Sequence, residues 1–171
     1  MDSTRKKSKL RSKQTSTYVP SSLTVRDRRA QSRMLARSRR LYREGVYYTR
    51  KPVRSFRSRP SGHIGRARRM YGVDTIGASA ELAGRTGCTK TALARIVKKG
   101  EGAYYSSGSR PNQTPQSWGL ARLASAITSG RAAAVDFHIL ERGCRPASRA
   151  LRLAEAARRK YGRKGKKKPK K

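Results

Sequence analysis

A run of hydroxyl and cationic side chains shortly after residue 88 has the composition of a surface that binds nucleic acid. Its members are Thr89, Lys90, Thr91, Arg95, Lys98 and Lys99. Hydroxyl and guanidinium groups hydrogen-bond to base edges and phosphates, and lysine ammonium groups pair with phosphates. On one helix the first four members face outward toward bases and phosphates, and the two lysines face the sugar-phosphate backbone. The chain must therefore supply a helix that presents them.

Two short helices joined by a tight turn are predicted to supply that helix. Ser79 is suited to cap a first helix over residues 80–85, and Thr89 is suited to cap a second helix that ends at Gly100. A glycine in the connecting turn, Gly87, completes the helix-turn-helix pattern.

The spacing of the apolar residues agrees with this motif. Ala83 is the small residue at which the two helices would cross, four positions before the turn glycine. The other apolar positions are filled by Leu82, Cys88, Leu93 and Ile96. An ordinary helix pair in a small helical domain has the same pattern, so spacing alone leaves both interpretations open. The basic composition adds support to the nucleic-acid interpretation.

A loop rich in Gly, Ser and Pro is predicted over residues 101–117. Its run SSGSR favours an anion-binding nest, in which backbone N–H groups, hydroxyls and a guanidinium surround one phosphate. The binding residues assigned to that nest are Ser107, Ser109 and Arg110. Asn112 and Gln113 either read adenine edges or hydrogen-bond the loop to itself. The loop lacks the GK[ST] ending of a P-loop, so ATP or GTP binding is not expected.

Arginines are also concentrated before residue 73. Residues 62–71 form a predicted helix with Ser61 as its cap and Gly72 as its end. The side chains that this helix turns outward, toward phosphate, are Arg66, Arg68 and Arg69.

Residues 24–42 are predicted to form an arginine-rich helix with a narrow apolar face. Such a helix is marginal alone, because like charges repel at three- and four-residue spacing. After it, Tyr47, Tyr48 and Phe56 alternate with arginines, among them Arg50. These rings either stack on exposed bases while the guanidinium groups hold phosphates, or dock the segment on the domain.

Apolar runs rich in small residues predict the rest of the core. Ser117 is suited to cap a helix that contains the single tryptophan, and Pro146 is suited to open the last helix. Val135, Phe137 and Ile139 alternate with polar residues like a short strand of about five residues, but the preceding residues 132–134 are alanines, which favour a helix. The expected fold class is mainly α, a small helical domain with a helix-turn-helix-like pair, flanked by disordered basic arms.

Charge divides the 171-residue chain, whose formal net charge is +35. Lys and Arg outnumber Asp and Glu by 22 to 3 in residues 1–72, by 12 to 6 in residues 73–157, and by 10 to none in residues 158–171. From this we expect a disordered basic arm, an arginine-rich segment, a compact helical core and a disordered Lys-rich tail. Their bounds are 1–23, 24–72, 73–157 and 158–171.

A polyanion is the expected partner, because the net charge far exceeds the magnitude of about 2–8 that keeps a small domain in solution. The cations lie in polar sequence without an adjoining apolar face, which disfavours a membrane anchor. No signal segment and no apolar run of membrane-spanning length is found, so neither secretion nor a membrane partner is expected. Nucleic acid is favoured, with double-stranded DNA as the main candidate.

No catalytic residue, metal or cofactor is predicted. Cys88 and Cys144 are the only cysteines, lie outside any zinc-ligand spacing, and are expected to be reduced and packed as small hydrophobic side chains. The acids of residues 73–157 are too scattered to hold the magnesium of a nuclease. The enzymatic alternative uses His138 with Asp136 as a base and its orienter, or Tyr104 as a strand-transfer nucleophile.

One long run has a family resemblance. KKGEGAYYSSGSRPNQTPQSWGLARLASAITSG, with TGC before it, VDFHIL after it and SFRSRPSGHIGRARRMYGV upstream, resembles a domain of unknown function of large double-stranded DNA viruses of algae and their relatives. The resemblance covers roughly residues 40–157. It implies a viral origin and transfers no catalytic residue.

The favoured function is that of a nucleic-acid-binding, genome-associated virion protein. Basic arms would neutralise phosphate, and the helical core would orient the nucleic acid. A minor capsid or internal structural protein is the alternative, and a nucleic-acid-processing enzyme is the second alternative. The implied location is the virion, or the host nucleus or cytoplasm during infection.

Overall fold

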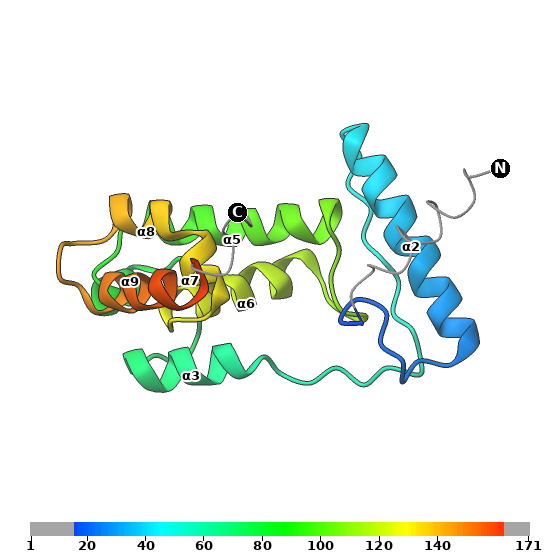
Figure 1. The fold of residues 1–171 in the computed structure, drawn as a ribbon, viewed down its shortest axis with the longest axis horizontal. Coiled ribbons are helices and arrows are strands. Elements are labelled where there is room, and N and C mark those ends of the chain that lie inside the picture. Colours follow the sequence, from blue (N-terminus) through cyan, green and yellow to red (C-terminus); the bar gives the residue numbers. More distant parts are fainter. Residues whose placement is uncertain (1–15, 163–171) are drawn as a thin grey trace, which may run out of the picture. The chain divides into compact units, whose positions relative to one another are not determined.

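The computed structural model describes residues 16–162, and their regular structure is helical (Figure 1). The helices are α2 (Val25–Arg43), α3 (Gly62–Tyr71), α4 (Ala80–Thr86), α5 (Lys90–Ser106), α6 (Pro115–Ile127), α7 (Arg131–Val135), α8 (Phe137–Gly143) and α9 (Arg149–Gly162). Within the described range the only extended pairing is an isolated antiparallel bridge between Cys88 and Cys144. The mainly α fold is confirmed. The disorder predicted at the chain ends falls, for residues 1–15 and 163–171, outside the described residues.

Contacts group the chain into two units. Among the described residues, the first unit comprises residues 16–59 and 103–115, and the second comprises residues 60–102 and 116–162. Charge composition divides the chain differently, into contiguous pieces. The contact grouping instead joins two separate stretches of chain within each unit.

In the first unit, helix α2 has one narrow buried side, as its composition predicts. The Thr24 hydroxyl accepts a hydrogen bond from the Asp27 N–H at 3.3 Å and so caps the first turn. The buried residues are Gln31, Leu35 and Ser38. The two polar members each donate to a backbone carbonyl at 3.1 Å, so the buried side leaves neither polar side chain unsatisfied.

Arg50 packs inside the first unit and links its two stretches of chain. The residue is 7% exposed, and its guanidinium carbon lies 3.8 Å from the centre of the Tyr104 ring. It donates to the Ser38 hydroxyl at 3.0 Å, to the Tyr104 carbonyl at 2.9 Å and to the Ser109 hydroxyl at 2.8 Å. Burial lowers the pKa of the Arg50 guanidinium. Hydroxyl and carbonyl dipoles and an aromatic face, rather than a carboxylate, therefore stabilise this buried cation.

The second unit has a core of aliphatic side chains separated by alanines. Its aliphatic members are Leu82, Leu93, Ile96, Leu123, Ile127, Ile139 and Leu140, and its alanines include Ala124, Ala126, Ala133, Ala150, Ala154 and Ala157. The Tyr71 hydroxyl donates to the Ile127 carbonyl at 2.6 Å, which ties α3 to α6. Burial raises the pKa of Tyr71 to about 12, so this hydroxyl stays protonated and remains a donor.

Helices α5 and α6 approach each other at two glycines. A Cβ on Gly100 would lie 2.6 Å from the Gly119 Cα, and a Cβ on Gly119 would lie 2.7 Å from the Val97 carbonyl oxygen. Gly100 thus lies inside α5, which continues to Ser106, and the prediction that the helix ends at Gly100 is wrong. Glycine costs about 1 kcal/mol relative to alanine within a helix. The close approach to α6 explains why it is present here.

The boundaries around the predicted loop also differ. Helix α6 begins at Pro115 rather than after a Ser117 cap. Proline has a fixed φ and no N–H, and both properties suit the first position of a helix. The irregular stretch therefore shrinks from residues 101–117 to residues 107–114.

Residues 131–143 are helical, the favoured one of the two predicted conformations. They form the two short helices α7 and α8, which are separated at Asp136. The last helix begins at Arg149 and not at Pro146. Ala147 has a φ of 59°, in the left-handed region, so no right-handed helix can run through it.

Gly100→Ala tests the α5–α6 crossing. We expect a loss of about 1–3 kcal/mol of unfolding free energy, because the new methyl group meets the α6 backbone. The matched control is Gly84→Ala inside α4, where an added Cβ meets nothing within 4 Å. The control should instead stabilise by up to about 1 kcal/mol. Urea denaturation measures both variants, and an equal shift in the two would contradict the close crossing.

Candidate nucleic-acid interface

The predicted caps and turn of the α4–α5 pair are confirmed. The Ser79 hydroxyl accepts from the Leu82 N–H at 3.1 Å, and the Thr89 hydroxyl accepts from the Ala92 N–H at 3.2 Å. Gly87 has a φ of 76° and ends α4 in the left-handed conformation that favours glycine. The two helices are thus joined by the short glycine turn that the sequence predicts.

The apolar positions assigned to the pair are buried. Leu82, Leu93 and Ile96 are each 0% exposed, and Cys88 is 4% exposed. Ala83 is partly buried and packs against the same core. The inward face of the pair is therefore the predicted one, which leaves its polar positions on the outside.

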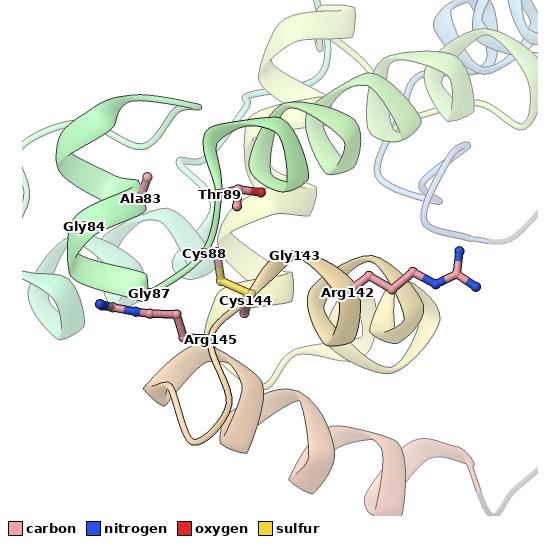
Figure 2. Close-up of a pocket in the computed structure, with 9 residues that line it drawn as sticks. All are labelled: Ala83, Gly84, Gly87, Cys88, Thr89, Arg142, Gly143, Cys144 and Arg145. Carbon is pink, nitrogen blue, oxygen red and sulfur yellow. A yellow bond between two sulfur atoms is a disulfide. The ribbon is translucent and has the colours of Figure 1, made fainter.

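The segment that joins α8 to α9 holds this turn in place (Figure 2). The Thr89 N–H donates to the Gly143 carbonyl and the Arg145 N–H donates to the Gly87 carbonyl, each at 2.8 Å. A Cβ on Gly143 would lie 2.3 Å from the Ala92 Cβ, so only glycine permits this approach to the first turn of α5.

Cys88 and Cys144 form a disulfide between these two hydrogen bonds. The prediction that both thiols are reduced is wrong. The antiparallel bridge brings the two Cα atoms to 3.8 Å, although the cysteines are 56 positions apart in the sequence. Directly opposed residues without mutual hydrogen bonds are the closest cross-strand pairs, which suits a disulfide.

The outward face of α5 carries most of the predicted binding residues. Those that are exposed are Thr89, Lys90, Thr91, Arg95, Lys98 and Lys99. The positions from Lys90 to Lys98 fall within about 140° of the helix circumference at 3.6 residues per turn. No acidic side chain lies in the first turn of α5. The face is therefore cationic from Lys90 to Lys98, and Glu101 follows one turn later.

Two further arginines border this region. Arg142 and Arg145 line, with the disulfide and the α4 turn, a surface hollow beside the start of α5. Figure 2 shows their side chains extending away from the disulfide in different directions. Sequence reasoning missed both, because only the return of the chain between α8 and α9 brings them beside α5.

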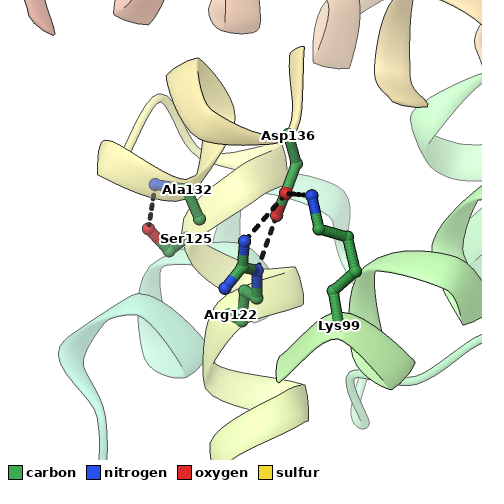
Figure 3. Close-up of polar contacts among 5 residues, drawn as sticks. All are labelled: Lys99, Arg122, Ser125, Ala132 and Asp136. Atoms are coloured by element: carbon green, nitrogen blue, oxygen red, sulfur yellow. Dashed lines mark hydrogen bonds and ion pairs between the residues drawn. The ribbon is translucent and has the colours of Figure 1, made fainter. Parts of the chain in front are cut away.

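Lys99 is exposed as well, but its ammonium is ion-paired. Its ammonium lies 2.7 Å from a carboxylate oxygen of Asp136, and the Arg122 guanidinium donates to both oxygens of that carboxylate at 2.7 and 2.8 Å (Figure 3). Asp136 is fully buried. The Lys99 ammonium thus differs from the other predicted cations of α5 in having a carboxylate partner. Its assignment to nucleic acid stays a prediction.

These contacts decide the ionisation of Asp136. Burial alone would raise the pKa of its carboxyl, but the hydrogen bonds from Arg122 and Lys99 and their positive charges lower the pKa below its usual range. The carboxylate thereby links α5, α6 and the junction of α7 and α8.

The predicted anion nest is not formed. The N–H groups of Ser107 and Gly108 both donate to the Ala103 carbonyl at 2.9 Å, as the end of α5. Ser109 is 1% exposed, and its hydroxyl accepts from Arg50 and donates to the Arg110 carbonyl. A helix C-terminus presents carbonyls and the negative end of the dipole, which repels anions. Of the three residues assigned to the nest, Ser107 and Arg110 are exposed.

That helix end attracts a cation instead. The Arg39 guanidinium donates to the Ser107 carbonyl at 2.9 and 2.7 Å. The Asn112 amide hydrogen-bonds the backbone of Val53 and Phe56. It therefore satisfies backbone groups of a distant segment, and not those of the loop itself as predicted. These contacts give the 107–114 segment a structural part in the first unit.

The predicted arginines of α3 are exposed but lie apart from α5. Arg66, Arg68 and Arg69 project from α3, whose inward side includes Ala67 and Tyr71. In Figure 1, α6 lies between α3 and α5 in this view. The structure therefore does not gather all the predicted cations into one patch.

The residues of the predicted run of aromatic and arginine side chains also differ in their exposure. Arg50 is buried, so it is not available to phosphate. The Tyr48 ring lies 4.6 Å below the Arg37 guanidinium, and the Tyr47 ring contacts Tyr105 edge-on at 5.1 Å. Tyr47 nevertheless remains 68% exposed.

The groups weighed for an enzyme are not assembled. Asp136 is committed to Lys99 and Arg122, so it does not orient His138. Tyr104 is fully buried beneath Arg50. The buried Nδ1 of His63 has no hydrogen-bond partner, and burial, followed by the charge of Arg66, lowers the pKa of this histidine. Among residues 16–162 no group of His, Cys, Asp and Glu has the arrangement of a metal site.

The fold and this surface define a small, mainly helical and strongly cationic protein. The chain belongs to a family described as Family of unknown function (DUF5824), whose model matches residues 18–141. The predicted resemblance to a domain of unknown function is confirmed at that level. No curated protein and no solved structure matches the chain. Over the described range, no helix combines the length and apolarity that crossing a membrane requires.

Cys88→Ser combined with Cys144→Ser tests the disulfide. We expect the double variant to lose about 2–4 kcal/mol of unfolding free energy, because the bond closes a loop across 56 positions. Urea denaturation with and without reductant measures this loss. Reductant should bring the wild type to the variant's midpoint and leave the variant unchanged, since the chain has no other cysteines. A wild-type denaturation midpoint that does not change with reductant would contradict the assignment of the disulfide.

Asp136→Asn tests the shared carboxylate. We expect a loss of about 3 kcal/mol near neutral pH, because two cations lose their buried partner. The folded pKa of Asp136 lies below the ordinary value of an aspartate carboxyl, 3.8. The stabilisation from this carboxylate is therefore complete above that pH and is lost as the pH falls through the folded pKa.

The wild type should therefore lose this advantage over Asp136→Asn on acidification below about pH 4. Asp74→Asn, which changes an exposed acid, is the control and should keep the wild-type dependence. Denaturation midpoints across a pH series measure the difference. A gap between wild type and Asp136→Asn that persists at the lowest pH would count against the shared carboxylate.

Proposed function

We propose that the protein binds double-stranded nucleic acid through the outward face of the α4–α5 pair. The observation that carries this proposal is an exposed row of cations on α5 that make no ion pair among the described residues. Lys90, Arg95 and Lys98 are exposed, and none of them makes an ion pair with another described residue. These side chains are free to displace counterions from phosphates, which is the main source of affinity for nucleic acid.

The position of the polar side chains on α5 supports a helix-turn-helix mode of binding. In that mode the first turns of the second helix enter the major groove, and residues there contact base edges. Thr89, Lys90 and Thr91 occupy those turns and are exposed. Arg95 and Lys98 follow on the same face, at a distance that suits the adjacent backbone.

The contacts of the turn also support the proposal. The disulfide and the two backbone hydrogen bonds fix the start of α5 relative to α4 and to the segment bearing Arg142 and Arg145. A surface fixed before binding loses less conformational entropy when it meets its partner. Arg142 and Arg145 extend the cationic surface beyond α5 itself.

The biological setting is part of the same proposal. The resemblance to a domain of large DNA viruses favours a role on a viral genome, within the virion or during infection. The charge of the whole chain, +35, suits the neutralisation of many phosphates. The first and last segments of the sequence, rich in Lys and Arg, would add non-specific affinity.

The test uses the full chain carrying Lys90→Gln, Arg95→Gln and Lys98→Gln together. Binding to a short DNA duplex is measured by fluorescence anisotropy over a series of salt concentrations. We expect the slope of log K against log salt to become shallower by about 2–3, since each lost phosphate contact removes about 0.9.

A matched control removes three exposed cations from α9, by Arg152→Gln, Arg159→Gln and Lys160→Gln. Its slope should change by less than about 1, because the net charge falls equally but no proposed contact is lost. Equal slopes for the two variants would show that total charge, and not the α5 face, determines binding.

A further inference from the structure

Helix α2 in the first unit carries a continuous stripe of exposed arginines. Its members are Arg26, Arg29, Arg33, Arg37 and Arg40, hereafter the α2 stripe. At 3.6 residues per turn these positions fall within about 80° of the helix circumference and extend for about 21 Å along its axis. The buried residues Gln31, Leu35 and Ser38 lie on the opposite side of the helix.

The α2 stripe borders a shallow hollow. Its lining includes Arg33, Arg37 and Arg40 together with Met34 and Tyr48. The Arg37 guanidinium stacks 4.6 Å above the Tyr48 ring, which restricts one arginine of the row. The hollow therefore combines a row of guanidinium groups with an apolar floor against which their carbon stems can pack.

The acids of the first unit do not neutralise this row. The described residues of the unit contain Asp27 and Glu44 as their only acids, and neither makes an ion pair there. The Asp27 carboxylate accepts hydrogen bonds from the N–H and the hydroxyl of Ser55, at 2.8 and 2.7 Å. Glu44 lies beyond the last turn of α2. Five arginines thus face outward without a carboxylate partner.

A nucleic-acid backbone is the partner that this arrangement fits best. The arginines recur every three or four residues, so their guanidinium groups form a regular row with steps of about one helical turn, 5.4 Å. Positive charges at regular spacing along the helix can pair with the negative charges that recur at regular spacing along a phosphate backbone. The planar guanidinium also matches the phosphate group through paired N–H donors.

We propose that the α2 stripe is a second nucleic-acid-binding surface, and that one chain bridges two duplex segments. This inference rests on the proposed function for its first surface, the α5 face. The α2 stripe and the α5 face belong to different contact units, and each has its own exposed cations. A protein with two such surfaces draws duplexes together and would compact a genome.

The experiment measures bridging with the full chain. One short duplex is immobilised on beads, a second labelled duplex is in solution, and capture of the label is followed at sub-saturating protein. The stripe variant carries Arg29→Gln, Arg33→Gln, Arg37→Gln and Arg40→Gln. We expect its capture to fall about tenfold or more while its affinity for a single duplex falls clearly less, since one surface is intact.

A matched control variant removes four exposed cations from the first unit outside the α2 stripe. Its changes are Lys51→Gln, Arg54→Gln, Arg57→Gln and Arg59→Gln. This control should capture the second duplex like the wild type. Equal loss of capture in the control and stripe variants would overturn the proposal, because charge alone would then explain bridging.

The α5 variant from the preceding test separates the two claims. If that variant binds a single duplex as the α9 control does, the proposed function fails, whatever the α2 stripe does. If it loses single-duplex binding while the stripe variant captures normally, the proposed function stands and bridging through the α2 stripe is wrong. That second outcome would indicate that the α2 stripe binds another polyanion, such as an acidic protein face.

A mixture of the stripe variant and the α5 variant completes the experiment. If one chain bridges two duplexes, neither variant has both surfaces and the mixture should not restore capture. Restored capture would mean that copies associate and each supplies one surface, which would overturn bridging by a single chain.

Discussion

The carboxylate of Asp136 is the one acidic side chain buried among the described residues, and two cations share it. Through Lys99 and Arg122 it connects α5, α6 and the α7–α8 junction, so the arrangement of the second unit depends on a single charge. The first unit buries Arg50 and has no carboxylate for it. Hydroxyls, a carbonyl and the Tyr104 ring take that place. Both units thus face one constraint, which is that cations greatly outnumber the anions that could neutralise them.

This imbalance leads from folding to function. Once Lys99 and Arg122 occupy Asp136, the described chain has no second buried carboxylate for another cation. Apart from Arg50, the remaining described Lys and Arg side chains lie where water or an external anion can solvate them. Helical periodicity then gathers some of them into rows, on the outward face of α5 and along α2. The composition therefore produces a surface that attracts polyanions, and the helices determine where on that surface the cations lie.

Local signals in the sequence predicted much of the α4–α5 pair. Ser79 and Thr89 cap their helices because short-range hydrogen bonds need only neighbouring residues, and Gly87 adopts a conformation that other residues rarely adopt. The contacts missing from the prediction involve distant partners. Gly100 continues the helix because of Gly119, Lys99 turns to Asp136, and Cys88 meets Cys144. A prediction made from neighbouring residues has no access to contacts that only the assembled core creates.

The disulfide also changes the connectivity of the chain. Cys88 and Cys144 close a covalent ring, and that ring contains α5, α6, α7 and α8 together with residues 103–115 of the first unit. A single peptide-bond cleavage anywhere between the two cysteines opens the ring without dividing the molecule. The helix that presents Lys90 and Arg95 therefore stays covalently attached on both sides of such a cut. In topological terms, the cationic face of α5 lies within the one stretch of chain that a single protease cut cannot release.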